Sequence, residues 1–159
     1  MLSAEQYVAA MAELAAGVAV VCIRDGDDDI GMTTTTLSSI SLEPPLVGVA
    51  VNSSSYVDEL FDRQPLWAVT ILAAGQRAIA SRFAAAGRPS ARLLLADLAS
   101  HRGAESDGLI VDGGVAALEC RTVRRIPAGD HTFVLAEPLA VDYTRTDDQP
   151  LIYVRRRYR

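Results

Sequence analysis

The sequence has 159 residues, of which 50% are hydrophobic and 22% charged, so it fits a single domain with a sizeable buried core. No stretch approaches the roughly 20 apolar residues that a membrane helix needs, and the first residues lack the basic region of a secretory signal. We therefore expect a cytoplasmic protein. The pI near 4.9 argues against a nucleic-acid surface but leaves recognition of one small anionic ligand open.

Residue types that are absent narrow the chemistry further. The chain has no lysine, which excludes a P-loop lysine and a pyridoxal Schiff base. Its two histidines, His101 and His131, form no zinc-binding pattern with the cysteines, so no metal site is expected. Cys22 and Cys120 lie far apart between apolar neighbours, which favours free, buried thiols over a disulfide. If the chain is an enzyme, an organic cofactor must supply its chemistry.

The first predicted element is an amphipathic helix over residues 4–16. Ser3 and Gln6 fit the capping-box pattern at its start, and Gly17 is a suitable residue to end it. Helical spacing places four large apolar side chains on one face: Tyr7, Val8, Met11 and Leu14.

Seven later segments have the apolar or β-branched character of strands. They are residues 18–23, 30–36, 46–51, 66–72, 115–126, 132–143 and 151–154. Short helices are predicted over residues 55–61, 76–86 and 91–98. Asp25-Gly26 marks a hairpin turn, residues 41–45 are expected to be a loop because they contain two prolines, and residues 88–107 are the least readable part. Many strands and few helices predict an antiparallel barrel rather than alternating βαβ units.

Three polar clusters interrupt the apolar segments. The first runs over residues 31–41 and contains Thr33, Thr34, Thr35 and Thr36, followed by Leu37. In an edge strand, these hydroxyls and the free backbone groups would suit the polar rim of a planar ring. The alternative is a threonine-rich strand with solvated side chains. The second cluster, Ser53, Ser54 and Ser55, precedes a predicted helix, where hydroxyls and amides suit one phosphate. Its alternative is plain N-capping, since Ser55 and Asp58 fit the capping-box pattern.

The third cluster is Gly129-Asp130-His131, just before a predicted strand. Gly-Asp favours a tight turn that would present the imidazole of His131 at the mouth of a barrel. Histidine titrates near neutral pH and can bond a phosphate or a carboxamide. A purely structural histidine is the alternative.

Taken together, these motifs resemble the flavin reductase-like, FMN-binding split-barrel family, which supplies reduced flavin to two-component monooxygenases. The resemblance runs from about Gly17 to Tyr158. Its most specific parts are the S-x-S-L-x-P-P-L pattern of residues 39–46 and the later Gly129-Asp130-His131. Further matching segments are Gly31-Met32-Thr33, Ser53–Ser55, Arg82-Phe83, Leu118-Glu119-Cys120 and Pro150-Leu151-Ile152-Tyr153.

The resemblance implies a mainly β fold with short helices, a split β-barrel of the antiparallel Greek-key type, as one domain over residues 1–159. It implies an NAD(P)H:flavin oxidoreductase that reduces FMN or FAD with NADH or NADPH, works as a homodimer and serves a partner monooxygenase. The implied roles are the flavin ring and ribityl chain for Thr33–Leu37, the phosphate for Ser53–Ser55, and closure of that side for Arg82 and Phe83. His131 would face the nicotinamide nucleotide, with Arg157 and Tyr158 nearby.

Two features depart from the family pattern. Thr34 and Thr35 replace smaller or amide side chains and would narrow the face on which nicotinamide stacks, and residues 88–107 match poorly. Two other functions therefore stay open: a protein that holds FMN as a tight prosthetic group without free-flavin turnover, and a non-enzymatic dimeric binding barrel. The sequence does not distinguish FMN from FAD or from a deazaflavin, nor NADH from NADPH.

Overall fold

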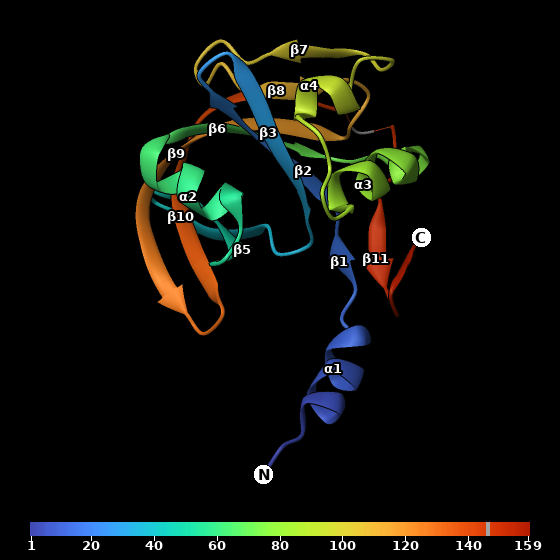
Figure 1. The fold of residues 1–159 in the computed structure, drawn as a ribbon. Coiled ribbons are helices and arrows are strands. Elements are labelled where there is room, and N and C mark those ends of the chain that lie inside the picture. Colours follow the sequence, from blue (N-terminus) through green and yellow to red (C-terminus); the bar gives the residue numbers. More distant parts are fainter. Residues whose placement is uncertain (146) are drawn as a thin grey trace.

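The structure, a computed structural model, describes residues 1–145 and 147–159 and is built mainly from antiparallel strands. Seven strands form the main sheet, in the spatial order β3, β2, β6, β9, β10, β5, β4. Their bounds are β2 Ala19–Asp25, β3 Asp28–Thr34, β4 Ser38–Leu42, β5 Pro45–Asn52, β6 Leu66–Ile71, β9 Ala116–Ala128 and β10 His131–Thr144. The sheet curls into a barrel whose two edge strands are β3 and β4 (Figure 1).

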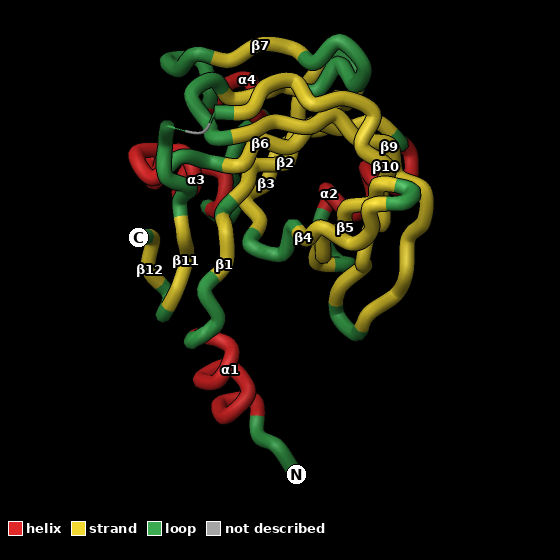
Figure 2. The backbone as a smooth tube through the Cα atoms, turned by 180° about the vertical axis from the view of Figure 1, so that it is seen from behind, coloured by secondary structure: helices red, strands yellow, loops and turns green. Residues whose placement is uncertain are grey.

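Smaller elements surround this barrel. Strands β1 (Ala16–Gly17), β11 (Ile152–Val154) and β12 (Arg157–Tyr158) form a small sheet beside it (Figure 2), and β7 (Ser100–Arg102) pairs with β8 (Leu109–Val111). The helices are α1 (Ala4–Ala12), α2 (Tyr56–Arg63), α3 (Arg77–Ala84) and α4 (Ala91–Leu94), with a 3₁₀ turn over Ala74–Gln76. None of the described helices has both the length and the apolar character to cross a membrane.

Strand β2 separates two hydrophobic cores. Because side chains alternate along a strand, Val21 and Ile23 face the core covered by α2, whereas Val20 and Cys22 face the core covered by α3. All four are buried. This two-sided burial explains why residues 18–23 read as one uninterrupted β-branched run rather than an alternating pattern.

Several local predictions are confirmed. Ser3 and Gln6 form the capping box, and Gly26, with φ of 59°, makes the turn between β2 and β3. Cys22 and Cys120 are free and buried. Desolvation, reinforced by a neighbouring carboxylate, raises the pKa of each thiol to about 12.

Other boundaries were predicted wrongly. The first helix ends at Ala12 rather than at residue 16, and no residue of it is buried. Ser41 and Leu42, expected in a loop, belong to β4, and Pro45 opens β5, so only Glu43-Pro44 makes the turn. A proline at the first position of a strand removes no ladder donor that the strand needs. Within residues 88–107, α4 is shorter than expected and β7 was missed, because each is only three or four residues long.

Candidate functional site

A cleft of about 360 Å³ opens where β3, β5, α2 and α3 meet, and we call it the threonine cleft. It brings together residues 32–36 of the first polar cluster, Ser55 of the second and His131 of the third. The residues around it are Met32, Thr33, Thr34, Thr35, Thr36, Ala50, Val51, Asn52, Ser55, Val57, Phe83, Ala84, Arg88 and His131. Register explains part of this meeting, since His131 on β10 pairs directly with Asn52 on β5.

Three of the four threonine hydroxyls are bonded within the protein. Thr33 donates to the carbonyl of Ala80 on α3 at 2.6 Å, which ties the strand to that helix. The hydroxyls of Thr34 and Thr36 lie 2.9 Å apart, and that of Thr36 also bonds the backbone of Ala50. Any ligand in the cleft would therefore meet this segment largely through backbone groups and through Thr35, whose hydroxyl bonds no described residue.

Thr34 lines the cleft, but little of it is open to solvent. Its side chain is only 6% exposed and its hydroxyl is taken up by Thr36, so it contributes little bulk to the open face. Thr35 is half-buried at the cleft wall and is the threonine whose size affects a ligand.

The three serines divide between two tasks. Ser53 donates to the carbonyl of Asp130 at 2.9 Å and Ser54 donates to Asn52 at 2.7 Å, and neither lines the cleft. Ser55 does line it, and caps α2 by accepting the amide of Asp58 at 3.2 Å. N-capping is therefore confirmed for Ser55, and phosphate binding by Ser55 stays a prediction.

The beginning of α2 offers an anion site beside Ser55. The first amides of a helix lack intrahelical acceptors, and those of Tyr56 and Val57 have no capping partner among the described residues. The nearby carboxylate of Asp58 does not oppose an anion there, because Arg125 binds it at 2.7 Å. The hydrogen bond that Arg125 donates to Asp58, helped by the charges of Asp58 and Asp62, raises the pKa of Arg125 against the opposing effect of burial.

Arg88 is a residue that the sequence analysis missed. It lines the threonine cleft and an adjoining hollow of about 240 Å³, and its Nε donates to the carbonyl of Gly31 at 2.7 Å. Burial lowers the pKa of its guanidinium, which stays charged at neutral pH all the same. Arg88 lies between Gly87 and Pro89, in the segment that matches the family poorly, and no motif there indicates a binding residue.

Arg82, the arginine expected to close the phosphate side, does not line the cleft. Its guanidinium is held by Asp97 at 2.7 and 3.1 Å and donates to the carbonyl of Leu94. The next residue, Phe83, is fully buried against the cleft wall, as its predicted position requires. Of these two neighbours on α3, Phe83 lines the cleft, whereas Arg82 only stabilises the fold.

His131 opens β10 at the mouth of the cleft. Its Nδ1 lies 2.7 Å from Oδ1 of Asp130, and its side chain is 42% exposed. That hydrogen bond, more than the charge of the imidazole, lowers the pKa of Asp130. Because Nδ1 is occupied, the other nitrogen, Nε2, is the one that would meet a ligand; no described residue bonds it.

The remaining predicted site residues lie outside the cleft. Leu37 packs against the core below α2. Arg157 and Tyr158 form β12, where the Tyr158 ring lies 5.3 Å from that of Tyr153. Within one chain, the structure does not bring Arg157 or Tyr158 to His131.

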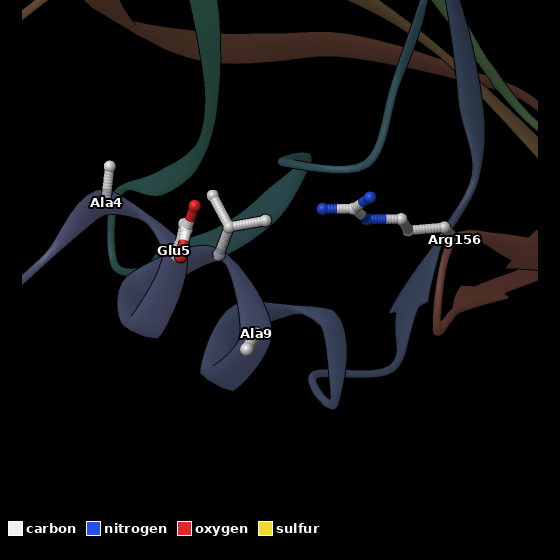
Figure 3. A pocket seen from close by; sticks show the side chains of 5 residues that line it. Ala4, Glu5, Ala9 and Arg156 are labelled. Atoms are coloured by element: carbon white, nitrogen blue, oxygen red, sulfur yellow. The ribbon is translucent and has the colours of Figure 1, made fainter.

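A separate hollow of about 320 Å³ lies between α1 and the turn after β11, shown in Figure 3. Arg156 points toward the helix across it, and Glu5 is the other charged residue of its lining. This hollow is open to solvent, and four of its five lining residues belong to the single helix α1. Its polar side chains, Glu5 and Arg156, do not form a binding site for a ligand. No group of three or more potential metal ligands occurs among residues 1–145 and 147–159.

A comparison with protein families decides what this arrangement is. The family described as flavin reductase like domain matches residues 11–159. The chain belongs to this family. This match confirms the resemblance drawn from the motifs of the flavin reductase-like chain, and with it the mainly β split-barrel fold.

Similar proteins agree with this assignment. The chain is 35% identical over 155 residues to the 4-hydroxyphenylacetate 3-monooxygenase reductase component of Thermus thermophilus, covering 98% of this chain and 95% of that protein. It is 33% identical to the NADH-dependent FMN reductase AsuE2 of Streptomyces nodosus subsp. asukaensis, over 96% of this chain and 82% of the other. The solved Streptomyces globisporus NADH:FAD oxidoreductase SgcE6, in complex with NAD and FAD fragments, superposes with a TM-score of 0.88 at 30% identity, over 98% of this chain and 90% of that one.

Proposed function

We propose that the flavin reductase-like chain transfers a hydride from a reduced nicotinamide nucleotide to FMN or FAD and delivers the reduced flavin to a partner monooxygenase. When both bind, the hydride passes from nicotinamide C4 to flavin N5, and this chemistry belongs to the cofactors. The observation that carries the proposal is the threonine cleft of a family member, which offers donors, a cation and a stacking wall.

The donors of the cleft favour one orientation of a bound flavin. The backbone of Thr33–Thr36 would bond the ring edge, while Ser55, the free amides of α2 and Arg88 would hold the phosphate. Phe83 closes the apolar side between them. This division follows the chemistry of the donors: strand backbone for a planar polar edge, and a helix N-terminus with an arginine for a phosphate.

The protein's part in hydride transfer is to position the reactants and exclude water. No pair of side chains in the cleft is arranged as a general acid and base, and hydride transfer needs none. His131 would bind the nicotinamide nucleotide through Nε2, with Asp130 fixing the ring through Nδ1. A histidine held in this way orients the donor without touching the flavin phosphate.

We expect the chain to accept both flavins. The hollow that adjoins the threonine cleft shares Ser55, Val57 and Arg88 with it, and so continues beyond the proposed phosphate position. That space suits the adenylate part of FAD, and FMN would leave it to solvent. NADH is the expected donor, because the FMN reductase relative and the solved FAD oxidoreductase are both described as using NADH.

We also propose that the chain forms a homodimer. Helix α1 projects from the barrel (Figure 1) and has no buried residue, although Tyr7, Val8 and Met11 are large and apolar, and Leu14, just beyond the helix, is exposed as well. Exposed apolar surface of this kind is typical of an interaction site. Light scattering should report twice the mass of one chain, and a monomer with full flavin affinity would contradict the dimer.

Absorbance and turnover test the whole proposal. The purified protein should oxidise NADH only when FMN or FAD is added, and titration calorimetry should detect binding of the added flavin. A yellow protein that retains one flavin per chain and does not reduce added flavin would instead be a protein with a prosthetic flavin. Absence of flavin binding up to roughly millimolar concentration would leave only a non-enzymatic barrel.

A further inference from the structure

A side-chain hydroxyl, that of Thr36, bonds the edge of β5 at a point where none of the described strands covers it. Strand β4 covers the outer edge of β5 only as far as the pair Ser38 and Gly48, so the ladder stops before Ala50. There the hydroxyl of Thr36 accepts the amide of Ala50 at 2.9 Å and donates to its carbonyl at 3.3 Å. One hydroxyl thus replaces the pair of backbone groups that a neighbouring strand would supply.

A second threonine completes the network. The Thr34 hydroxyl accepts the amide of Thr36 at 3.1 Å and lies 2.9 Å from the Thr36 hydroxyl. A hydroxyl has one donor and two acceptor sites, and this arrangement uses all three on Thr36: Thr34 and the Ala50 amide donate to it, and it donates to the Ala50 carbonyl. The network is satisfied without water or ligand.

We propose that the Thr36 hydroxyl is a positioning group for the flavin ring. It links two walls of the threonine cleft, since Thr36, in the loop between β3 and β4, and Ala50, on β5, both line that cleft. By fixing residues 34–36 it also fixes the backbone of Thr35, which lies between the two bonded threonines and faces the same space. This inference rests on the proposed function, which places the ring against that backbone.

The physical consequence is preorganisation. A flavin that binds to a wall already held in place does not have to order it, and the ring is presented to the nicotinamide in one position. The rival explanation is that Thr36 only seals a sheet edge. In that case its loss would lower stability and leave both flavin affinity and the hydride-transfer rate unchanged.

Two substitutions at Thr36 separate these explanations. Thr36→Val keeps the β-branched shape and removes the hydroxyl, whereas Thr36→Ser keeps the hydroxyl. We expect Thr36→Val to weaken flavin binding about five- to 30-fold, as loss of hydrogen bonds of ordinary strength would. At saturating flavin its kcat should fall about three- to 100-fold through misplacement of the ring. Thr36→Ser should restore both values to within about twofold.

A matched control is available in the same sheet. Thr122 accepts the indole N–H of Trp67 at 3.1 Å and does not line the threonine cleft, so Thr122→Val removes a structural hydroxyl from elsewhere. It should lower the melting temperature and leave flavin affinity and kcat unchanged. Flavin affinity is measured by fluorescence quenching with FMN, kcat from NADH oxidation, and folding by circular dichroism.

The possible outcomes are distinct. Wild-type affinity and kcat in Thr36→Val, or equal losses in the valine and serine variants, would overturn the inference. If Thr36→Val does not fold, Thr34→Val decides, because it removes the bonds of the Thr34 hydroxyl to the amide and hydroxyl of Thr36 and keeps those between Thr36 and Ala50. About two- to fivefold weaker flavin binding supports the inference, and no change overturns it. Wild-type protein that binds FMN but oxidises no NADH would refute the proposed function, while the affinities would still decide the inference.

Discussion

Replacement of Arg88 by methionine tests which arginine meets the flavin phosphate. Arg88→Met keeps a long apolar stem in the half-buried position and removes the guanidinium. Sequence analysis had assigned this side of the site to Arg82, whose charge the structure commits to Asp97. Loss of the guanidinium should therefore weaken FMN binding at Arg88 and leave it unchanged at Arg82.

The magnitude follows from the burial of the group. A full charge pair at about 4 Å and an effective dielectric constant near 20 would contribute about 4 kcal/mol. Arg88 is partly open to solvent, so the lower range for a hydrogen bond to a charged group, about 1.5–3 kcal/mol, is the better estimate. This corresponds to about 10- to 150-fold weaker binding of FMN.

Riboflavin makes the assay specific, because it carries the same ring without the phosphate. Fluorescence titrations should show that Arg88→Met loses affinity for FMN and keeps its affinity for riboflavin. Arg82→Met, the matched variant, should bind both flavins like the wild type and only lose stability through its broken pair with Asp97. Equal loss of FMN and riboflavin in Arg88→Met would refute the reasoning, since Arg88 would then act only by holding the carbonyl of Gly31.

Three further predictions concern other parts of the chain. His131→Ala should raise the KM for NADH about five- to 150-fold and leave flavin affinity unchanged, so loss of flavin with an unchanged KM would place the histidine wrongly. Desolvation lowers the pKa of His101, but its hydrogen bonds to the carboxylates of Asp112 and Asp142 outweigh this effect and raise that pKa. The stability difference between wild type and His101→Gln in urea should thus be greatest below about pH 6.5 and vanish as pH rises through the raised pKa; a difference that grows with pH would contradict this. Gly108→Ala should destabilise the fold by about 1–3 kcal/mol, because a Cβ there would lie 2.9 Å from the backbone of two strands, whereas Gly75→Ala, with open space around it, should melt like the wild type.

The sequence by itself determined the features that depend on neighbouring residues. The capping box of Ser3, the turn at Gly26 and the cap at Ser55 are each encoded within four residues, and the structure has all three. The β-branched run over residues 18–23 was enough to predict a buried strand, and the structure buries it against two cores. The motif pattern was specific enough to predict the family and its split barrel.

Only the tertiary structure decided which polar groups meet. Thr36 bonds Ala50 because the ladder between β4 and β5 stops short, and His131 joins the cleft because it pairs with Asn52. Neither contact can be predicted from the residues that flank Thr36 or His131 in the sequence.

Competition between binding partners explains why Arg88 lines the cleft and Arg82 does not. Arg82 and Arg88 have the same chemistry, and no local pattern separates them. Arg82 forms an ion pair with Asp97, fifteen residues away, which stabilises the fold. Arg88 donates to the carbonyls of Gly31 and Ala85, and among the described residues no carboxylate neutralises its charge. A sequence shows which side chains are able to bind a phosphate, but the packing of distant segments determines which of them is already taken.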